Sequence, residues 1–163
     1  MRLLPTLLIA LLSTAHAAPP ALPDQFGNSD SLANYDGTAV LAIVVNVRKL
    51  RWVGKWEEAL RPTLPELVSI RVADITDKPP PTHEKVVGLL QKRVPPEVPV
   101  LIDMDNSWAT TYELDTKEPC LLLFDADHQL VAEFRGRPKG KLVEEVIAAL
   151  DNYFPASPVA DST

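Results

Sequence analysis

The sequence contains a single cysteine, Cys120, so no disulfide can form within the chain and its stability must come from packing. Its three histidines lack the spacing of metal ligands, and no G-x-S-x-G, Walker or G-x-G-x-x-G pattern occurs. Beyond residue 17 no apolar run is long enough to span a membrane. We therefore expect no disulfide framework, no metal, no cofactor and no stable membrane span.

Basic residues are outnumbered by acidic ones, 16 against 22, which gives a formal net charge of −6. The charge is one unit more negative if Arg2 is removed with a leader segment. Such a balance argues against non-specific binding to a polyanion. We therefore expect no nucleic acid among the partners.

The first seventeen residues have the organisation of a secretory signal peptide. A positive charge at Arg2 precedes an apolar run over residues 3–12, and small residues at Ala15 and Ala17 form an A-x-A cleavage pattern. The run is short for a membrane span, although an uncleaved anchor is the alternative. We expect a mature chain that begins at Ala18 and is periplasmic or secreted.

Turn-forming residues dominate 18–37, which we interpret as an N-terminal extension with Phe26 and Leu32 docked on the core. A single domain follows over 38–154, and a disordered tail over 155–163. Within the domain, apolar runs predict strands at 38–47, 67–75, 98–104, 119–125 and 129–136. Helical spacing predicts helices from Trp56 to Pro65, at 82–93 with Thr82 as N-cap, at 106–114 capped by Asn106 or Ser107, and at 140–154. Strands that alternate with helices and end in a hairpin favour an α/β/α three-layer fold around a mixed sheet.

Several segments agree in order with a known superfamily. They are "LPDQFG" and "SLANYDG", then "VLAIVVNV", then "VPVLIDMDNSWATTYEL", and finally "EPCLLLFDADHQLVAEFRG". Over about residues 22–153 the chain resembles the thioredoxin-like superfamily, and most closely its exported redoxin branch of TlpA-type and peroxiredoxin-related proteins. The resemblance implies a thioredoxin-like fold and puts Pro119 at the position of the family's cis-proline, a structural role.

The chain departs from that family at the turn after the first core strand. The resemblance puts Trp52 and Lys55 where the W-C-x-x-C motif has its two cysteines. Dithiol exchange needs a thiolate nucleophile with a resolving thiol beside it, and an indole and an ammonium cannot form the mixed disulfide. A peroxiredoxin also needs a thiolate near the first turn of this helix. The sequence therefore predicts a redox-inactive turn.

Two candidate sites remain. A local cluster of cations, Arg48, Lys49, Arg51 and Lys55, surrounds Trp52 near the predicted start of a helix, where it could hold an anion or an acidic partner. The alternative is an ordinary solvated loop. Cys120 opens the apolar run "CLLLF" and is expected to be a buried core residue. The alternative is a reactive thiol activated by Lys55 or a helix N-terminus.

Paired acids at strand ends could suggest a divalent cation, but they lack the spacing and glycine of an EF-hand, so we predict no metal site. These acids are Asp103, Asp105, Asp125 and Asp127. The leading hypothesis is a binding or accessory protein of the cell envelope, with an unknown protein or small anionic ligand as partner. The alternatives are a single-cysteine thiol redox enzyme that uses Cys120 and a structural or stress protein of the envelope.

Overall fold

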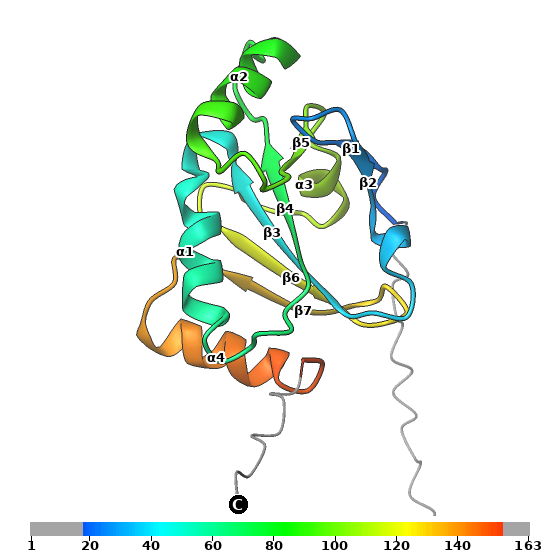
Figure 1. Cartoon of the computed structure of the whole chain (residues 1–163), viewed down its shortest axis with the longest axis vertical. Helices are drawn as coiled ribbons and strands as arrows, with labels where there is room; N and C mark the ends of the chain where they lie inside the picture. Colours follow the sequence, from blue (N-terminus) through cyan, green and yellow to red (C-terminus); the bar gives the residue numbers. More distant parts are fainter. Residues whose placement is uncertain (1–17, 155–163) are drawn as a thin grey trace, which may run out of the picture.

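The computed structural model describes residues 18–154, so the expected signal peptide and tail lie outside the described residues. Its elements follow the predicted order, after a short N-terminal hairpin (Figure 1). The strands are β1 (Leu22–Pro23), β2 (Ser29–Asp30), β3 (Val40–Asn46), β4 (Ser69–Asp74), β5 (Leu101–Asp103), β6 (Cys120–Phe124) and β7 (Leu130–Arg135). The helices are α1 (Arg51–Leu60), α2 (His83–Arg93), α3 (Ser107–Thr111) and α4 (Gly140–Leu150), with 3-10 turns η1 (Leu32–Tyr35) and η2 (Val47–Lys49).

The central sheet has five strands in the order β5-β4-β3-β6-β7. Strand β3 lies in the middle, parallel to β4 and antiparallel to β6, and β7 completes the antiparallel edge. Six of the seven residues of β3 are buried. A strand covered on both faces needs apolar side chains on both, which explains its continuous apolar run. The predicted mixed sheet is confirmed.

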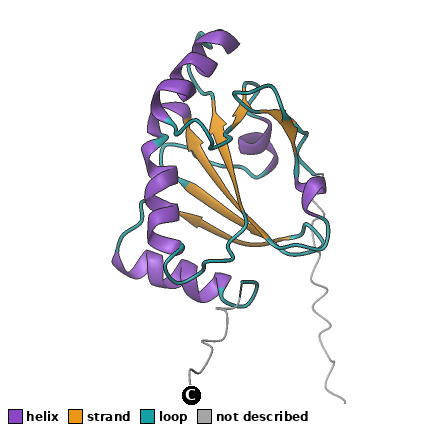
Figure 2. Cartoon of the chain, in the orientation of Figure 1, coloured by secondary structure: helices purple, strands orange, loops and turns teal. Residues whose placement is uncertain are grey.

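Two apolar layers separate the sheet from its helices. On one face, alternate residues of β3 such as Ile43 pack with Trp56 of α1 and with residues of α2 and α4. On the other face, Val44 packs with Trp108 of α3 and with the N-terminal segment. Figure 2 shows the long helices on one side of the sheet, with α3 and the N-terminal hairpin on the other. The thioredoxin-like three-layer arrangement is therefore present.

The N-terminal extension is folded onto the sheet edge. The Asp24 carboxylate accepts hydrogen bonds from the backbone N–H groups of Phe26 and Asn28, at 2.8 and 2.9 Å, which fixes the β1–β2 hairpin. Leu32 is buried as predicted, but the Phe26 side chain is 49% exposed and does not dock. Phe26 lies at the hairpin tip, where the hydrogen-bonded turn directs the chain away from the core.

Helix boundaries differ most at α1 and α3. Helix α1 begins at Arg51 rather than Trp56, because only Val53 in its first turn is buried and apolar spacing detects the rest poorly. Asn106 occupies the N-cap position of α3, one of the two residues expected there, but at φ 56° its side chain makes no capping hydrogen bond. Asp103 accepts from the backbone N–H groups of Ser107 and Trp108, each at 2.8 Å. The cap thus comes from the end of the preceding strand.

Candidate functional site at the β3–α1 turn

The turn between β3 and α1 is held by Asn46. Its side-chain oxygen accepts a hydrogen bond from the Arg48 backbone N–H at 2.9 Å, and its amide donates to the Thr76 hydroxyl. Helix α1 is anchored beneath by Val53, Trp56 and Leu60, which are buried. The Trp56 indole also donates to the Gly136 carbonyl at 3.1 Å. These contacts hold the polar residues of the turn at one end of the sheet.

The structure does not bring the predicted cations together as one patch. The Arg48 guanidinium pairs with Asp77 at 3.0 Å, and the Lys55 ammonium pairs with Glu58 at 2.8 Å on the exposed side of α1. The Lys49 ammonium donates to the Lys117 backbone carbonyl, across 68 residues of sequence. Arg48 and Lys49 line one pocket, whereas Arg51 lines another. The contiguous run of charge in the sequence is therefore divided in space.

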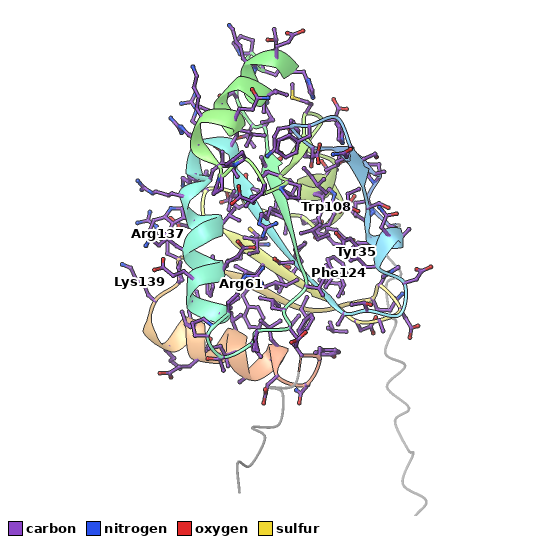
Figure 3. All side chains as sticks on the ribbon, in the orientation of Figure 1. Tyr35, Arg61, Trp108, Phe124, Arg137 and Lys139 are labelled. Carbon is purple, nitrogen blue, oxygen red and sulfur yellow. The ribbon has the colours of Figure 1, made fainter. Side chains whose placement is uncertain are left out.

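Trp52 does not present a free flat surface. It is half-buried and packs against the edge of the core under α1. The guanidinium groups of Arg51 and Arg137 lie over its ring, at 5.1 and 5.0 Å from the centroid. Arg137 in turn pairs with the Glu118 carboxylate at 3.1 Å, beside the outer end of the sheet (Figure 3). Both guanidinium groups are thus within cation–π distance of the indole, a favourable arrangement for its electron-rich ring.

Pocket A is the name we give to the hollow between the β3–α1 turn and the segment that leads into β6. Its volume is about 370 Å³. Arg48 and Lys49 line it on one side, and Asp115, Thr116 and Lys117 line it on the other. Sequence reasoning missed Lys117, because no local pattern indicates that residue 117 returns to the turn at residue 49.

A buried carboxyl group lies at the inner end of pocket A. Asp74 accepts hydrogen bonds from the Thr116 hydroxyl at 2.6 Å and from the Asn106 amide at 2.7 Å. Burial raises the pKa of Asp74 above its ordinary value, and the nearby Asp103 carboxylate adds to the rise, although both hydrogen bonds oppose it. Sequence reasoning missed Asp74 as well, since a lone acid at a strand end is a weak signal.

Cys120 is buried in β6, as predicted for a core residue. Its side chain packs with Val44 and Trp108 on the α3 face of the sheet, opposite to α1. Burial raises the pKa of the Cys120 thiol to about 11, and the Arg135 guanidinium opposes this only partly. Lys55 and a helix N-terminus were the two contacts that could have activated this thiol. Among the described residues, neither Lys55 nor the start of α1 contributes to the shift in its pKa.

Pro119 is buried just before β6, and its carbonyl accepts from the Gly136 N–H at 2.9 Å. The expected cis bond before it is wrong. Within residues 18–154 the cis peptide bond is Lys78–Pro79. Pro119 instead starts the β6–β7 hairpin, where its missing N–H costs no ladder hydrogen bond.

One acid of each expected pair accepts hydrogen bonds from backbone N–H groups. Asp103 caps α3, and Asp125 accepts from the N–H groups of Asp127 and Gln129, both at 2.9 Å, in the β6–β7 turn. Within residues 18–154 no group of three or more His, Cys, Asp or Glu side chains is placed to hold a metal ion. The same part of the chain has no helix with the length and apolar character needed to cross a membrane.

Comparison with known proteins finds matches in structure but not in sequence. No protein-family model matches the chain, and no curated protein matches it either. Among solved structures, the exposed lipoprotein thioredoxin of Streptococcus pneumoniae has a TM-score of 0.65 at 18% identity, covering 82% of this chain and 100% of that one. A thiol:disulfide interchange protein described as DsbE, from Chlorobium tepidum, has a TM-score of 0.59 at 21% identity, covering 83% and 95%.

A third solved structure is similar to the same extent. It is the bacterioferritin comigratory protein of Xanthomonas campestris, with a TM-score of 0.59 at 15% identity, covering 83% of this chain and 91% of that one. Its structure is described in connection with alkyl peroxide reduction. At such identities the similarity shows the fold alone. The chain therefore has a thioredoxin-like fold, and with a single cysteine it lacks the cysteine pair of the W-C-x-x-C motif.

Proposed function

We propose that this chain is an exported thioredoxin-fold protein of the cell envelope that binds an acidic segment of a partner protein at pocket A. The observation that carries the proposal is the position of Lys49. Its ammonium lines pocket A and donates to a backbone carbonyl, and within residues 18–154 no carboxylate forms an ion pair with it. A carboxylate from a partner protein would form an ion pair with this ammonium group.

The other charges around pocket A support the same ligand. Arg48 and Lys117 add positive charge at the rim, each with a partly exposed acidic neighbour, Asp77 for Arg48 and Asp115 for Lys117. Complementary charge of this kind gives specificity and fast association rather than high affinity.

Chemistry at sulfur is poorly supported as the function. The β3–α1 turn contains no cysteine, and the Cys120 thiol is buried on the opposite face with a raised pKa. The thiolate is the reactive species in both dithiol exchange and peroxide reduction. Export is supported by the leader-like residues 1–17 and by the description of one structural neighbour as an exposed lipoprotein.

Binding to a hexaglutamate peptide tests the proposal. We expect saturable binding at low salt that weakens as salt is added, since screening reduces the attraction between exposed charges. Lys49→Gln should weaken binding several-fold. Lys139→Gln is the matched control, because Lys139 is exposed at the start of α4 (Figure 3) and does not line pocket A. Equal affinities for the two variants would reject pocket A.

Two further measurements separate the rival interpretations. If inorganic phosphate displaces the peptide completely at the same concentration of negative charge, the result would favour a small anionic ligand over an acidic protein segment. Insulin reduction or peroxide turnover by the wild type that is lost in Cys120→Ser would favour a single-cysteine enzyme. The proposal requires neither result, and either one would contradict it.

A further inference from the structure

A second pocket, pocket B, lies between α1, β4 and the segment 94–100, and shares no lining residue with pocket A. Its volume is about 180 Å³. Most of its wall is apolar, formed by Leu50, Val53, Val94, Pro95, Val98 and Val100. For comparison, an apolar cavity of about 150 Å³ is enough to hold a benzene molecule. Pocket B therefore has room for one compact apolar group.

Arg71 of β4 lines this apolar pocket with an unsatisfied hydrogen-bond donor. Its side chain is 13% exposed, and its terminal nitrogen pairs with the Glu57 carboxylate at 2.6 Å. Its Nε is buried and, within residues 18–154, has no hydrogen-bond partner. Buried donors without partners are uncommon and costly, so this N–H is a place where an acceptor would be stabilising.

Positive charge exceeds negative charge around pocket B. Glu57 is the single acid of the lining, and the same oxygen that pairs with Arg71 also accepts from the Ser69 hydroxyl at 2.9 Å and lies 3.7 Å from Arg61. Arg93, in the last turn of α2, also lines the pocket, and within residues 18–154 it has neither an ion pair nor a side-chain hydrogen bond. Beside this apolar wall, the Arg93 guanidinium and the Arg71 Nε lack a partner within the described residues, which suits a ligand that has an apolar body and a carboxylate.

The wall of pocket B is held in place from outside. The Gln25 side chain, from the N-terminal extension, donates to the Val98 carbonyl at 2.7 Å and accepts from the Val100 N–H at 2.8 Å. These two hydrogen bonds hold segment 98–100, which is an irregular connection before β5. A wall ordered before binding reduces the entropy that binding costs.

We propose that pocket B binds a small carboxylic acid with a compact apolar body, with its carboxylate at Arg71 and Arg93 and its body against the apolar wall. The site does not depend on the acidic-segment function of pocket A. Phenylacetate is a suitable probe because it carries a ring and a carboxylate. Phenylacetamide keeps the ring without the charge, and acetate keeps the charge without the ring.

The probes are compared by titration of the full-length protein, followed by NMR or calorimetry. Phenylacetate should bind saturably, and phenylacetamide and acetate should each bind at least tenfold more weakly. Equal binding of phenylacetate and phenylacetamide would overturn the role of the guanidinium groups. Equal binding of phenylacetate and acetate would overturn the role of the apolar wall.

Two matched pairs of variants locate the site. Gly54 lines pocket B from α1, and a Cβ built there meets nothing within 4 Å, so the first side-chain atom fits and Gly54→Leu should obstruct the pocket. Gly88→Leu is its control, because Gly88 of α2 has the same free space but does not line pocket B. We expect at least tenfold weaker phenylacetate binding for Gly54→Leu and unchanged binding for Gly88→Leu.

The second pair tests the charge. Arg93→Gln should weaken phenylacetate binding several-fold, whereas Lys92→Gln, at the neighbouring cation that does not line the pocket, should not. Equal affinities within the arginine and lysine pair would overturn the proposal. If Gly54→Leu fails to fold, Arg93→Gln and Lys92→Gln still test the proposal, because both residues are exposed. Lys49→Gln tests peptide binding at pocket A, and its result does not change the interpretation of phenylacetate binding at pocket B.

Discussion

At the scale of single residues, Asp74 and Cys120 both have a raised pKa but have opposite relations to pocket A. Asp74 lies at its inner end and keeps hydrogen-bond partners for both carboxylate oxygens. Cys120 is buried on the face covered by α3, where its sulfur contacts backbone carbonyls of residues 115 and 118 at 3.6 and 3.5 Å. The first group belongs to a candidate site, and the second belongs to the core.

Cys120 should behave as an inert core thiol. We expect slow reaction with a thiol reagent in the native state and fast reaction after unfolding, because burial disfavours the thiolate. Cys120→Ala should lower the free energy of unfolding by about 1–3 kcal/mol through lost packing. Labelling kinetics and urea unfolding measure these effects. Fast labelling of the native protein would instead identify a reactive cysteine.

The same thiol should make stability depend on pH under alkaline conditions. The thiol pKa is about 11 in the folded protein against 9.0 as the ordinary value, so the unfolded chain loses this proton first. The free energy of unfolding should therefore fall by about 1 kcal/mol between pH 9 and 10. Cys120→Ala should remove this fall. Tyr35 and Tyr112, with pKa values of about 12 against an ordinary value of 10.0, add a smaller loss that begins near pH 10 and that Cys120→Ala leaves in place.

Asp74→Asn should stabilise the protein at neutral pH. The folded-state pKa of Asp74 lies above its unfolded value of about 4, so stability is lost as the pH rises from that value through the folded-state pKa. The neutral amide avoids that loss and can still hydrogen bond to Thr116 and Asn106. Urea unfolding should show a gain at pH 7 and little change at pH 3. Asp127→Asn, at an exposed turn, should show no such pH-dependent gain.

At the scale of elements, α3 depends on a residue outside it. Both oxygens of the buried Asp103 accept hydrogen bonds from the first turn of α3, and the Ser107 hydroxyl adds a third at 2.8 Å. A helix of five residues is too short to be stable from its own hydrogen bonds. The end of β5 therefore holds the helix that covers Cys120.

Asp103→Ala should destabilise the protein by about 3 kcal/mol, since it removes a helix cap and leaves buried donors unsatisfied. Asp105→Ala is the control, because Asp105 is exposed, and it should stay within about 0.5 kcal/mol of the wild type. Thermal unfolding measures both. A melting temperature that rises with Ca²⁺ or Mg²⁺ and depends on Asp103 would show that the acid binds a cation instead.

At the scale of the whole molecule, helix α1 follows the central strand β3, and the resemblance to thioredoxin-like proteins puts Trp52 and Lys55 at the two cysteine positions of the W-C-x-x-C motif. Trp52 lies in the first turn of α1 and Lys55 in the second. A thiol near a helix N-terminus has a lowered pKa and so a higher fraction of thiolate. The chain therefore lacks the sulfur atoms at these positions but keeps the helix N-terminus beside them, whereas the expected cis bond before Pro119 is absent.

The double variant Trp52→Cys/Lys55→Cys should gain dithiol reductase activity, whereas the wild type should show none. Insulin reduction with a thiol donor measures this activity. The single variant Lys55→Cys, which has no resolving thiol beside it, should remain close to background. A properly folded double variant that is inactive would show that the turn has lost more than its cysteines, and activity in the wild type would contradict the absence of dithiol chemistry.

Sequence pattern was enough to predict the order of strands and helices, the mixed sheet and the buried state of Cys120. Each depends on local apolar spacing: the continuous run in β3 and the run "CLLLF" in β6 specify strands covered on both faces. The prediction that the β3–α1 turn has no dithiol chemistry also requires only the identities of its residues. Such conclusions follow from composition and short periods, which chain packing does not alter.

Only the tertiary structure decided which side chains meet. Lys49 and Lys117, Asp74 and Thr116, and Trp52 and Arg137 are far apart in the chain. Both pockets form where loops from different elements approach one another, and no local periodicity encodes that approach. The run of cations from Arg48 to Lys55 was divided for the same reason: the chain turns from β3 into α1 there, so successive side chains point to different surfaces.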